Sequence, residues 1–260
     1  MPAGLRLALL GDPVNHSLSP VMHRQALEDA GLHGEYLTIQ ADQGRLEQEV
    51  GRLRAGRLDG VNVTMPLKAA ATDLCDRLTA EAGRAGAVNS MRAERGEVVG
   101  HSTDVVAFHA LLTGWGDVPL LVLGAGGSAR AALAAAGPMK VYVSARRRET
   151  ADRLAGLHER MTTLDWGVAV AGATLVNATP LGMNGERLPE GVLTVASGLI
   201  DLPYGERPTP AVGEASDLGI PTVDGIEFLA RQAAAAFTWW TGRPVDSGRL
   251  AGAARKRLKT

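Results

Sequence analysis

Short apolar runs alternate with segments of helical period along most of the chain. Residues 5–10 form an apolar run that stops at Gly11-Asp12-Pro13, and residues 20–30 follow as a predicted helix that Ser19 caps and Gly31 ends. The rest of the first half predicts strands at 35–39, 58–64, 88–92 and 97–100, the last two paired around Glu94-Arg95-Gly96, and helices at 44–54 and 69–82.

The second half alternates strands and helices more regularly. It predicts strands at 119–123, 141–144, 173–177 and 198–202, an alanine-rich helix that follows residues 124–129 and ends at Ala136, and helices at 149–158, 225–241 and 246–259. Continuous apolar strands between helices are typical of a parallel sheet that is covered on both faces. We expect the domain boundary near Thr103, before the glycine-rich segment that starts at Gly124.

Composition narrows the class of protein. A length of 260 residues predicts one or two domains, and 45% hydrophobic with 21% charged residues excludes a disordered chain. A net charge of -1 argues against nucleic acid as a partner. No apolar run reaches the ~20 residues that span a bilayer, and the N-terminal apolar stretch is too short for a signal peptide, so no membrane partner is expected.

The single cysteine, Cys75, cannot form an internal disulfide. It falls within the helix predicted at 69–82, where a small core residue is the simplest interpretation. A chain with one cysteine suits the reducing cytoplasm, where we expect this protein.

The segment Gly124-x-Gly126-x-x-Ala129 matches a dinucleotide-binding fingerprint between a strand and a helix. The first glycine permits the tight turn, the second allows the backbone to approach a pyrophosphate, and the alanine allows close packing of helix on strand. A purely structural turn is the alternative, which the flanking strand and helix disfavour.

The residues about 20 positions after the fingerprint indicate which dinucleotide binds. NAD enzymes usually place an acid there, whereas this chain has Arg146-Arg147-Arg148 after Ser144-Ala145. Guanidinium groups suit a 2′-phosphate, so the cluster favours NADP. The alternative is a solvated basic cluster at a strand end.

Lys68 is the first candidate for chemistry. The chain has only four lysines, and Lys68 alone follows a polar turn stiffened by proline. A lysine can give up a proton when it is desolvated, and arginine cannot, although an exposed lysine at a helix start explains the position equally well. Further polar positions are Ser17 and Ser19, Asn89, and Asp104, which could pair with Lys68 or simply cap the next helix.

The order of these motifs resembles that of the shikimate dehydrogenase family. The motifs are Ser-x-Ser-Pro (17–20), Asn-Val-Thr-x-Pro-x-Lys (62–68), Gly-Ala-Val-Asn (86–89), Thr-Asp (103–104), Gly-Ala-Gly-Gly-x-x-Arg (124–130), Asn-Ala-Thr-x-x-Gly-Met (177–183) and Gly-x-x-x-x-x-x-Gln (225–232). The stretch that ends at Lys68 is the most specific, and the glycine loop is the least. The resemblance covers nearly the whole chain.

The resemblance implies an α/β fold: an open, mostly parallel α/β substrate domain plus a Rossmann NADP-binding domain, with a cleft between them. The substrate domain would comprise residues 1–102, completed by 225–260, and the NADP-binding domain residues 103–224. The implied activity is the reversible, NADP-dependent reduction of 3-dehydroshikimate to shikimate in aromatic amino-acid biosynthesis.

The resemblance also implies roles for individual residues. Lys68 and Asp104 would be the catalytic pair, Lys68 exchanging a proton with the substrate oxygen while Asp104 orients it. Substrate contacts would come from Ser17, Ser19, Asn62, Thr64, Asn89, Tyr204 and Gln232. NADP contacts would come from Gly124, Ala125, Gly126, Gly127, Ser128, Ala129, Arg130, Ala145, Arg146, Arg147, Thr179, Leu202 and Gly225.

Two departures from the family pattern leave the substrate range open. The family usually has Asn-Arg-Thr where this chain has Ala145-Arg146-Arg147, and asparagine where it has Ser102, beside an unusual His101. A quinate/shikimate dehydrogenase of broader range, or a non-catalytic metabolite-binding paralogue, are therefore alternatives. The sequence does not fix the oligomeric state, and a homodimer is compatible with it.

Other enzyme classes fit less well. A methylenetetrahydrofolate dehydrogenase would need a stacking aromatic, and no tyrosine lies near Lys68 in the sequence. A short-chain dehydrogenase would need a lysine four residues after a tyrosine, which none of the three tyrosines has. No metal site is expected, because His16, His23 and His101 are dispersed and are interpreted as non-ligands.

Overall fold

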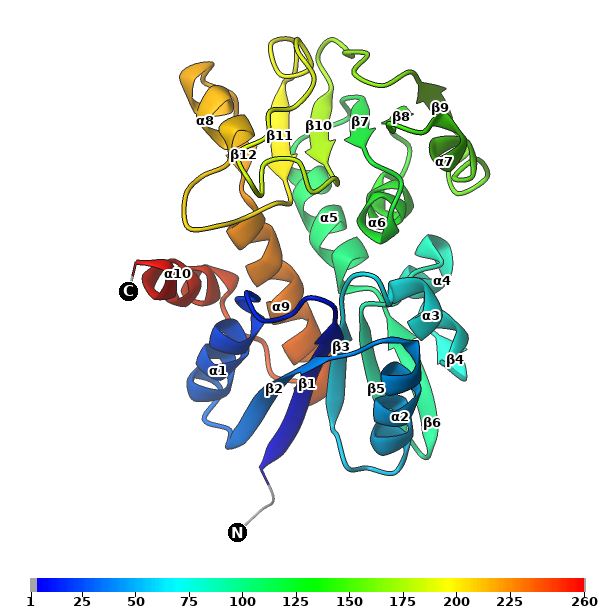
Figure 1. The fold of residues 1–260 in the computed structure, drawn as a ribbon, viewed down its shortest axis with the longest axis vertical. Helices are drawn as coiled ribbons and strands as arrows, with labels where there is room; N and C mark the ends of the chain where they lie inside the picture. Colours follow the sequence, from blue (N-terminus) through cyan, green and yellow to red (C-terminus); the bar gives the residue numbers. More distant parts are fainter. Residues whose placement is uncertain (1–3, 260) are drawn as a thin grey trace. The chain divides into compact units, whose positions relative to one another are not determined.

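A computed structural model describes residues 4–259 of the chain. Residues 1–3 and 260, the two ends of the predicted substrate domain, lie outside this range. The chain forms two compact units: the residues up to Val106 together with Ala230–Leu258, and the segment Ala107–Leu229 (Figure 1). Each unit contains its own six-stranded sheet.

The first unit is built on a mixed sheet of strand order β2-β1-β3-β5-β6-β4. Its elements in chain order are β1 (Leu5–Gly11), α1 (Ser19–Asp29), β2 (Gly34–Gln40), α2 (Gln43–Arg54), β3 (Gly60–Val63), α3 (Lys68–Asp73), β4 (Arg77–Leu78), α4 (Ala80–Ala85), β5 (Ser90–Glu94) and β6 (Glu97–His101). Strands β1, β2 and β3 run parallel, whereas β5 is antiparallel to both β3 and β6.

Alternation along β1 explains why both faces of this sheet are covered. Ala8 and Leu10 belong to the core that α2 closes with Leu46, Val50 and Leu53. The alternate residues Leu7 and Leu9 are buried on the opposite face. The run predicted at 5–10 is thus apolar throughout because each face packs against helices.

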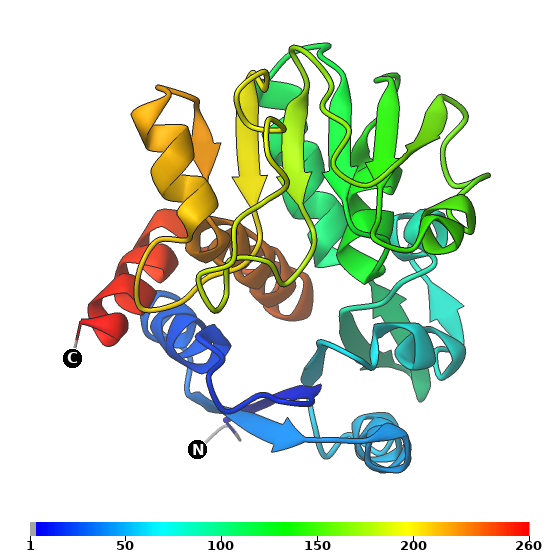
Figure 2. The same cartoon turned by 45° about the horizontal axis from the view of Figure 1, so that its top comes forward.

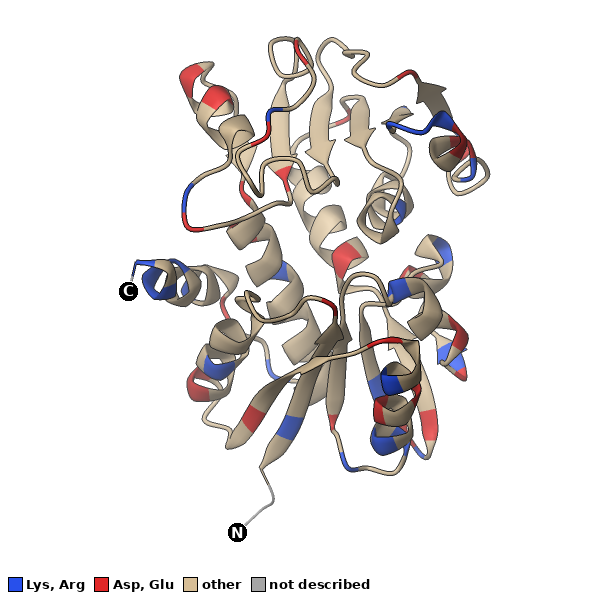
Figure 3. Ribbon diagram, in the orientation of Figure 1, with Lys and Arg blue, Asp and Glu red and all other residues tan. Residues whose placement is uncertain are grey.

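Two late helices complete the first unit. α9 (Gly225–Thr241) starts in the second unit and ends in the first, where the Trp240 indole leaves no room for a side chain at Gly60. α10 (Ser247–Leu258) packs against α1, and Arg249 pairs with Asp29 at 2.6 Å. Figure 3 shows that basic residues gather on α10.

The helix predicted at 69–82 is wrong, because this stretch contains two short helices and a strand. α3 ends at Asp73, β4 pairs in parallel with β6, and Thr79 caps α4 by accepting a hydrogen bond from the Ala82 amide at 3.4 Å. Cys75 lies between α3 and β4, not inside a helix.

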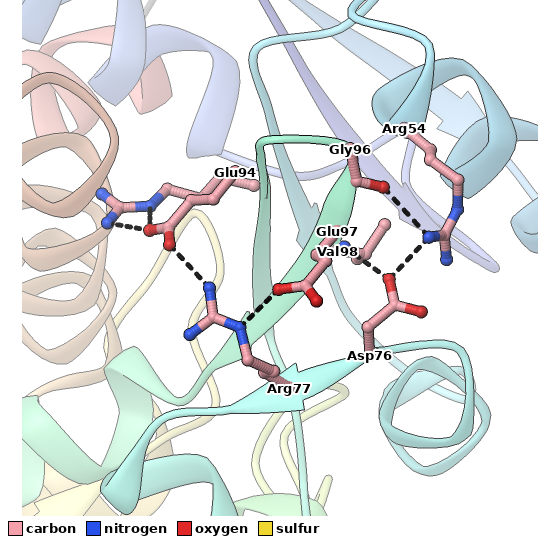
Figure 4. A network of polar contacts seen from close by, with 8 residues as sticks. Arg54, Asp76, Arg77, Glu94, Gly96, Glu97 and Val98 are labelled. Atoms are coloured by element: carbon pink, nitrogen blue, oxygen red, sulfur yellow. Dashed lines mark hydrogen bonds and ion pairs between the residues drawn. The ribbon is translucent and has the colours of Figure 1, made fainter.

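Long-range polar contacts hold this interruption (Figure 4). Asp76 accepts hydrogen bonds from the Val98 amide and from Arg54, each at 2.6 Å, while Arg77 binds Glu94 and Glu97 at 2.8 Å. These partners are 17 to 22 residues away in the sequence, so local helical spacing could not reveal them.

The predicted cap of the first helix also needs correction. α1 begins at Ser19 itself, its N-cap residue is Leu18, and no side chain caps it. Instead, the Ser17 hydroxyl accepts a hydrogen bond from the Ser19 amide at 3.2 Å. Ser19 therefore does not spend its hydroxyl on the helix cap that the local sequence suggested.

The second unit has an all-parallel sheet of order β12-β11-β10-β7-β8-β9 (Figure 2). Its elements are α5 (Thr103–Gly114), which starts in the first unit, β7 (Leu120–Leu123), α6 (Gly127–Ala135), β8 (Val141–Ser144), α7 (Arg148–Asp152), β9 (Met161–Leu164), β10 (Thr174–Asn177), β11 (Gly198–Asp201), α8 (Pro210–Asp217) and β12 (Thr222–Val223). The parallel sheet predicted from the sequence is confirmed. β9, β12 and α8 were not predicted, and α7 is shorter than the helix expected at 149–158.

Within residues 4–259, none of the helices combines the length and apolar character that crossing a membrane requires.

Candidate active site

One edge of the first unit's sheet gathers most of the predicted substrate residues. β1 and β3 end at this edge, β5 begins there because it is antiparallel, and β6 ends there. The segments that leave or enter these strands carry Ser17 and Ser19, Thr64 and Lys68, Asn89, and Asp104. Residues up to 87 positions apart in the sequence thus share one edge by topology alone.

Lys68 and Asp104 form an ion pair at this edge. Lys68 is the first residue of α3, and its Nζ contacts Oδ2 of Asp104. The Asp104 side chain is 3% exposed and that of Lys68 is 17% exposed. The ammonium therefore retains access from one side while the carboxylate that holds it is buried.

Asp104 is not the N-cap of α5, which was the alternative interpretation of this residue. The helix begins one residue earlier, at Thr103, and Asp104 lies in its first turn. Its carboxylate is directed to side chains of other elements: Oδ2 to Lys68 and Oδ1 to Asn89.

Asn89 connects the ion pair to its surroundings. Its Nδ2 lies within hydrogen-bond distance of Asp104 Oδ1 at 2.9 Å and Gln232 Oε1 at 3.1 Å. Its Oδ1 accepts a hydrogen bond from the Thr103 amide at 2.8 Å. Gln232 comes from α9, so a helix late in the chain supplies a residue to a cluster otherwise built by the first 104 residues.

Asn62 on β3 adjoins the same cluster. Its Nδ2 donates to the Asn89 carbonyl at 3.1 Å, and its Oδ1 accepts from the Tyr36 hydroxyl at 2.8 Å. Thr64 follows β3, and its amide donates to the Leu10 carbonyl at 2.8 Å, which ties the loop before Lys68 to β1.

The glycine-rich loop of the second unit has the geometry that an anion-binding turn needs. Gly124 has φ +111°, and a Cβ there would lie 2.7 Å from the Ala178 carbonyl oxygen, so only glycine fits. Gly126 is the N-cap of α6, and the space around its Cα is open. Because no side chain caps α6, the amides of its first turn, from Gly127, Ser128 and Ala129, are left for an anion.

Basic side chains follow the next strand, as predicted. Ala145 is buried, and Arg146 and Arg147 are exposed, with no ion pair to any residue between 4 and 259. Arg148 instead pairs with Asp165. Two of the three arginines are therefore available to a phosphate.

A buried network supports the loops after β10 and β11. Asn177 Oδ1 accepts from the Thr179 hydroxyl at 2.6 Å, and Asn177 Nδ2 donates to Asp201 Oδ1 at 2.7 Å. Asp201 also accepts from the Thr209 hydroxyl, and burial raises the pKa of the Asp201 carboxyl. The motif at 177–183 pointed to Asn177 and Thr179, but the sequence did not indicate their buried partners Asp201, at the end of β11, and Thr209.

Leu202 and Gly225 meet in the second unit. A Cβ at Gly225 would overlap the carbonyl oxygens of Leu202 and Pro203, so the start of α9 lies directly against this backbone. Tyr204 follows in the same loop and belongs to the second unit, as do the glycine loop and Arg130. The predicted NADP contacts thus all lie in one unit, whereas the predicted substrate contacts, apart from Tyr204, lie in the other.

Two of the histidines interpreted as non-ligands, His23 and His101, are buried against aromatic rings. Across residues 4–259, no three histidine, cysteine or acidic side chains group as a metal site would. His23 stacks on Tyr36, and His101 stacks on Trp239 and hydrogen-bonds Thr79 at 2.8 Å. Burial lowers the pKa of both imidazoles, for His23 to about 3.

Comparisons with known proteins identify the family. Residues 9–91 match the shikimate dehydrogenase substrate binding domain. A shikimate dehydrogenase (NADP(+)) of Exiguobacterium sibiricum is 34% identical over 261 residues, which cover 98% of this chain and 99% of that protein. The chain belongs to the shikimate dehydrogenase family.

Relatives from Thermus thermophilus support the family assignment at both levels. A shikimate dehydrogenase (NADP(+)) from this organism is 40% identical over 268 residues, covering 98% of this chain and 99% of its own. A crystal structure of the Thermus thermophilus enzyme in complex with NADP(H) and shikimate has a TM-score of 0.87 at 36% identity, covering 97% of this chain and 99% of that one. The predicted pair of an α/β substrate domain and a Rossmann-like sheet is the fold of this family.

Proposed function

We propose that this protein catalyses the reversible, NADP-dependent reduction of 3-dehydroshikimate to shikimate, a step of aromatic amino-acid biosynthesis. The observation that carries the proposal is the Lys68-Asp104 ion pair, held by Asn89 and Gln232 at the edge where the substrate motifs meet. Full-length relatives with this activity support the same reaction.

Lys68 is the proposed acid and base. When bound, NADPH supplies a hydride to the carbonyl carbon, and the ketone oxygen needs a proton as its negative charge develops. The Lys68 ammonium gives that proton during reduction and its amine takes it back during oxidation of shikimate. Asp104 fixes the position of Nζ and is placed to accept a hydrogen bond from a neighbouring ring hydroxyl.

Hydrogen-bonding side chains would hold the rest of the substrate. Ser17 and Ser19 provide hydroxyl groups for the carboxylate without a competing charge, and Tyr204 would add a third. Amide and hydroxyl groups for the ring hydroxyls would come from Asn62, Thr64, Asn89 and Gln232. Hydroxyls and amides suit a polyhydroxylated acid because each can donate or accept as the ligand requires.

The residues of the second unit fit NADP. The amides at Gly127, Ser128 and Ala129, with Arg130 nearby in α6, would receive the pyrophosphate, and the open space at Gly126 allows its approach. Arg146 and Arg147 beside Ala145 would hold the 2′-phosphate. Thr179, Leu202 and Gly225 would border the nicotinamide, and the absence of a side chain at Gly225 lets the start of α9 lie against the Leu202 backbone.

The domain roles follow from these assignments. Residues 1–102 with 225–260 would bind the substrate, in line with the family match at 9–91, and residues 103–224 would bind NADP. We place the enzyme in the cytoplasm, which suits its one free cysteine. Light scattering of the purified protein tests whether it forms a homodimer.

The decisive experiment measures initial rates with shikimate and with quinate, each with NADP and with NAD. We expect the highest kcat/KM for shikimate with NADP, and no loss of activity after treatment with a chelator. Comparable values for quinate would assign the broader activity, for which Ser102 and His101 are the relevant departures. A protein that binds shikimate but reduces neither cofactor would be a metabolite-binding paralogue.

A further inference from the structure

The buried imidazole of His23 has no role in the reaction proposed above. It lies on α1, is 1% exposed, and stacks in parallel on the Tyr36 ring with a centroid distance of 4.2 Å. The Trp240 ring is 5.4 Å away on α9. A neutral imidazole is expected in such a place, because burial among rings disfavours its charge.

Tyr36 and its stacked partner His23 lie beside Asn62. The Tyr36 hydroxyl donates to Asn62 Oδ1 at 2.8 Å. His23 Nδ1 has no hydrogen-bond partner among residues 4–259, so the imidazole acts on this pair through its stack on Tyr36.

These contacts determine which way the Asn62 amide points. Its oxygen accepts from the Tyr36 hydroxyl, and one proton of Nδ2 is used by the Asn89 carbonyl at 3.1 Å. The second Nδ2 proton has no acceptor among residues 4–259, and the side chain is half-buried. Asn62 therefore presents an N–H donor beside Asn89, whose own side chain contacts Asp104 and Gln232.

We propose that Tyr36, held by its stack on His23, is a positioning residue that keeps Asn62 as a hydrogen-bond donor toward an oxygen of the substrate. The proposal rests on the proposed function, because Asn62 is one of the predicted substrate contacts. It adds a requirement on the ligand: the group that meets Asn62 must accept a hydrogen bond. A hydroxyl or carboxylate oxygen satisfies this requirement, and an ammonium group does not.

A purely structural role for the two rings makes different predictions. If they only stabilised the core, their loss would lower the unfolding midpoint and would change KM for shikimate and KM for NADP alike. If they act through Asn62, their loss changes the affinity for shikimate alone, and the effect disappears when the Asn62 side chain is removed. A double-mutant cycle separates the two cases.

The experiment uses Tyr36→Phe, which removes one oxygen atom and keeps the stack on His23. We expect KM and the calorimetric Kd for shikimate to rise about 3- to 10-fold, as the loss of one hydrogen bond implies, with an unchanged KM for NADP. His23→Ala, which removes the ring stacked on Tyr36, should act in the same direction. In an Asn62→Ala background, Tyr36→Phe should change KM by less than about twofold.

Tyr142→Phe, on β8 of the second unit, is the matched control and should leave KM for shikimate unchanged. The proposal is overturned if Tyr36→Phe binds shikimate like the wild type, or if KM rises equally for shikimate and NADP. It is also overturned if the effects of Tyr36→Phe and Asn62→Ala on KM for shikimate are additive. A wild-type protein without shikimate activity would instead contradict the proposed function, so the two failures are distinguishable.

Discussion

At the scale of single residues, the side chain of Asn89 shows how polar groups are arranged around Lys68. Asn89 ties Asp104 to the start of α5 and to Gln232, so the carboxylate keeps one oxygen for Lys68. Buried polar groups need such partners, because an unsatisfied one costs about 1–3 kcal/mol. The lysine is thus the more exposed member of the ion pair, and the carboxylate is the more firmly held one.

Lys68→Ala tests this assignment. We expect kcat to fall by ~10²–10⁴-fold, the usual contribution of general acid–base catalysis, while the Kd for NADP stays unchanged. Steady-state rates and calorimetric titration measure the two effects. Lys140→Ala, at an exposed lysine of the second unit, is the control, and an unchanged kcat in Lys68→Ala would contradict the role of the lysine.

Arg146→Ala tests the choice of cofactor. A charge-assisted hydrogen bond to phosphate contributes roughly 1.5–3 kcal/mol, so kcat/KM for NADP should fall about 10- to 100-fold. The low end is expected where Arg147 compensates. The value for NAD should hardly change, and Arg153→Ala, in the same region, serves as control. An equal fall with both cofactors would mean that Arg146 supports the fold or the pyrophosphate site.

His23 makes stability depend on pH in a defined direction. Burial lowers its pKa from 6.5 to about 3, so the folded protein keeps the ring neutral where the unfolded chain takes up a proton. The stability contribution is complete above pH 6.5 and is lost as the pH falls toward 3, by up to about 1.4 kcal/mol per pH unit.

Urea unfolding between pH 5 and 8 measures this effect as a difference between two proteins. The free energy of unfolding of His23→Phe should depend less steeply on pH than that of the wild type, because the phenylalanine ring does not titrate. His109→Phe, at an exposed position of α5, controls for loss of a histidine as such. Parallel pH profiles for wild type and His23→Phe would show that the buried ring is not responsible.

At the scale of elements, local signals in the sequence predicted what local contacts stabilise. The hairpin of β5 and β6 was predicted from two strand runs that flank Glu94-Arg95-Gly96. In the structure, Arg95 and Gly96 adopt the left-handed conformations, with φ of +53° and +85°, that its tight turn needs. Strand β4 was not predicted, because it is held by β6, Glu94 and Glu97, which come about 20 residues later in the chain and leave no local signal.

The same distinction applies to the site. Lys68, Asn89 and Asp104 stand in recognisable motifs, so the sequence alone indicated them. Tyr36 and His23 belong to no motif that indicates a chemical role. Asn62, which accepts a hydrogen bond from Tyr36, lies 26 residues beyond it. Only the pairing of β2, β1 and β3 brings them together, which no spacing along the chain discloses.

Asp201 at the end of β11 joins two further elements, and its removal should loosen both. Asp201→Ala removes the acceptor of the buried Thr209 hydroxyl and one of the two acceptors of Asn177 Nδ2, the other being the Leu181 carbonyl, so we expect the free energy of unfolding to fall by about 2–4 kcal/mol. The Kd for NADP should rise more than that for shikimate, since Asn177 holds Thr179. Asp217→Ala, exposed at the end of α8, is the control. Equal weakening of both ligands would contradict the link to the cofactor loop.

At the scale of the whole molecule, the first unit is discontinuous in the sequence. Leu250, Ala251 and Ala254 of α10 are buried, and Arg249 reaches back to Asp29 on α1. A chain that ends at Val245 lacks this cover, and its free energy of unfolding should fall by about 3–5 kcal/mol, mostly from lost apolar burial.

Urea denaturation of the shortened protein measures that loss. A chain that ends at Ala254 keeps the buried residues and removes only the exposed basic end, so it should unfold like the full-length protein. An unchanged midpoint for the chain that ends at Val245 would show that α10 contributes little to the first unit.

The return of α9 and α10 to the first unit also sets the order in which the newly made protein can become active. The residues up to Val106 leave the ribosome first, but Gln232 and the rings of Phe237 and Trp240 are synthesised after a further segment of roughly 120 residues. At ~5–20 residues per second, that delay is about 6–25 s. During this interval the first sheet lacks the cover of α9 and α10, while the intervening unit is being synthesised. A polypeptide released early from translation would therefore contain Lys68 and Asp104, yet lack the helix that completes their surroundings.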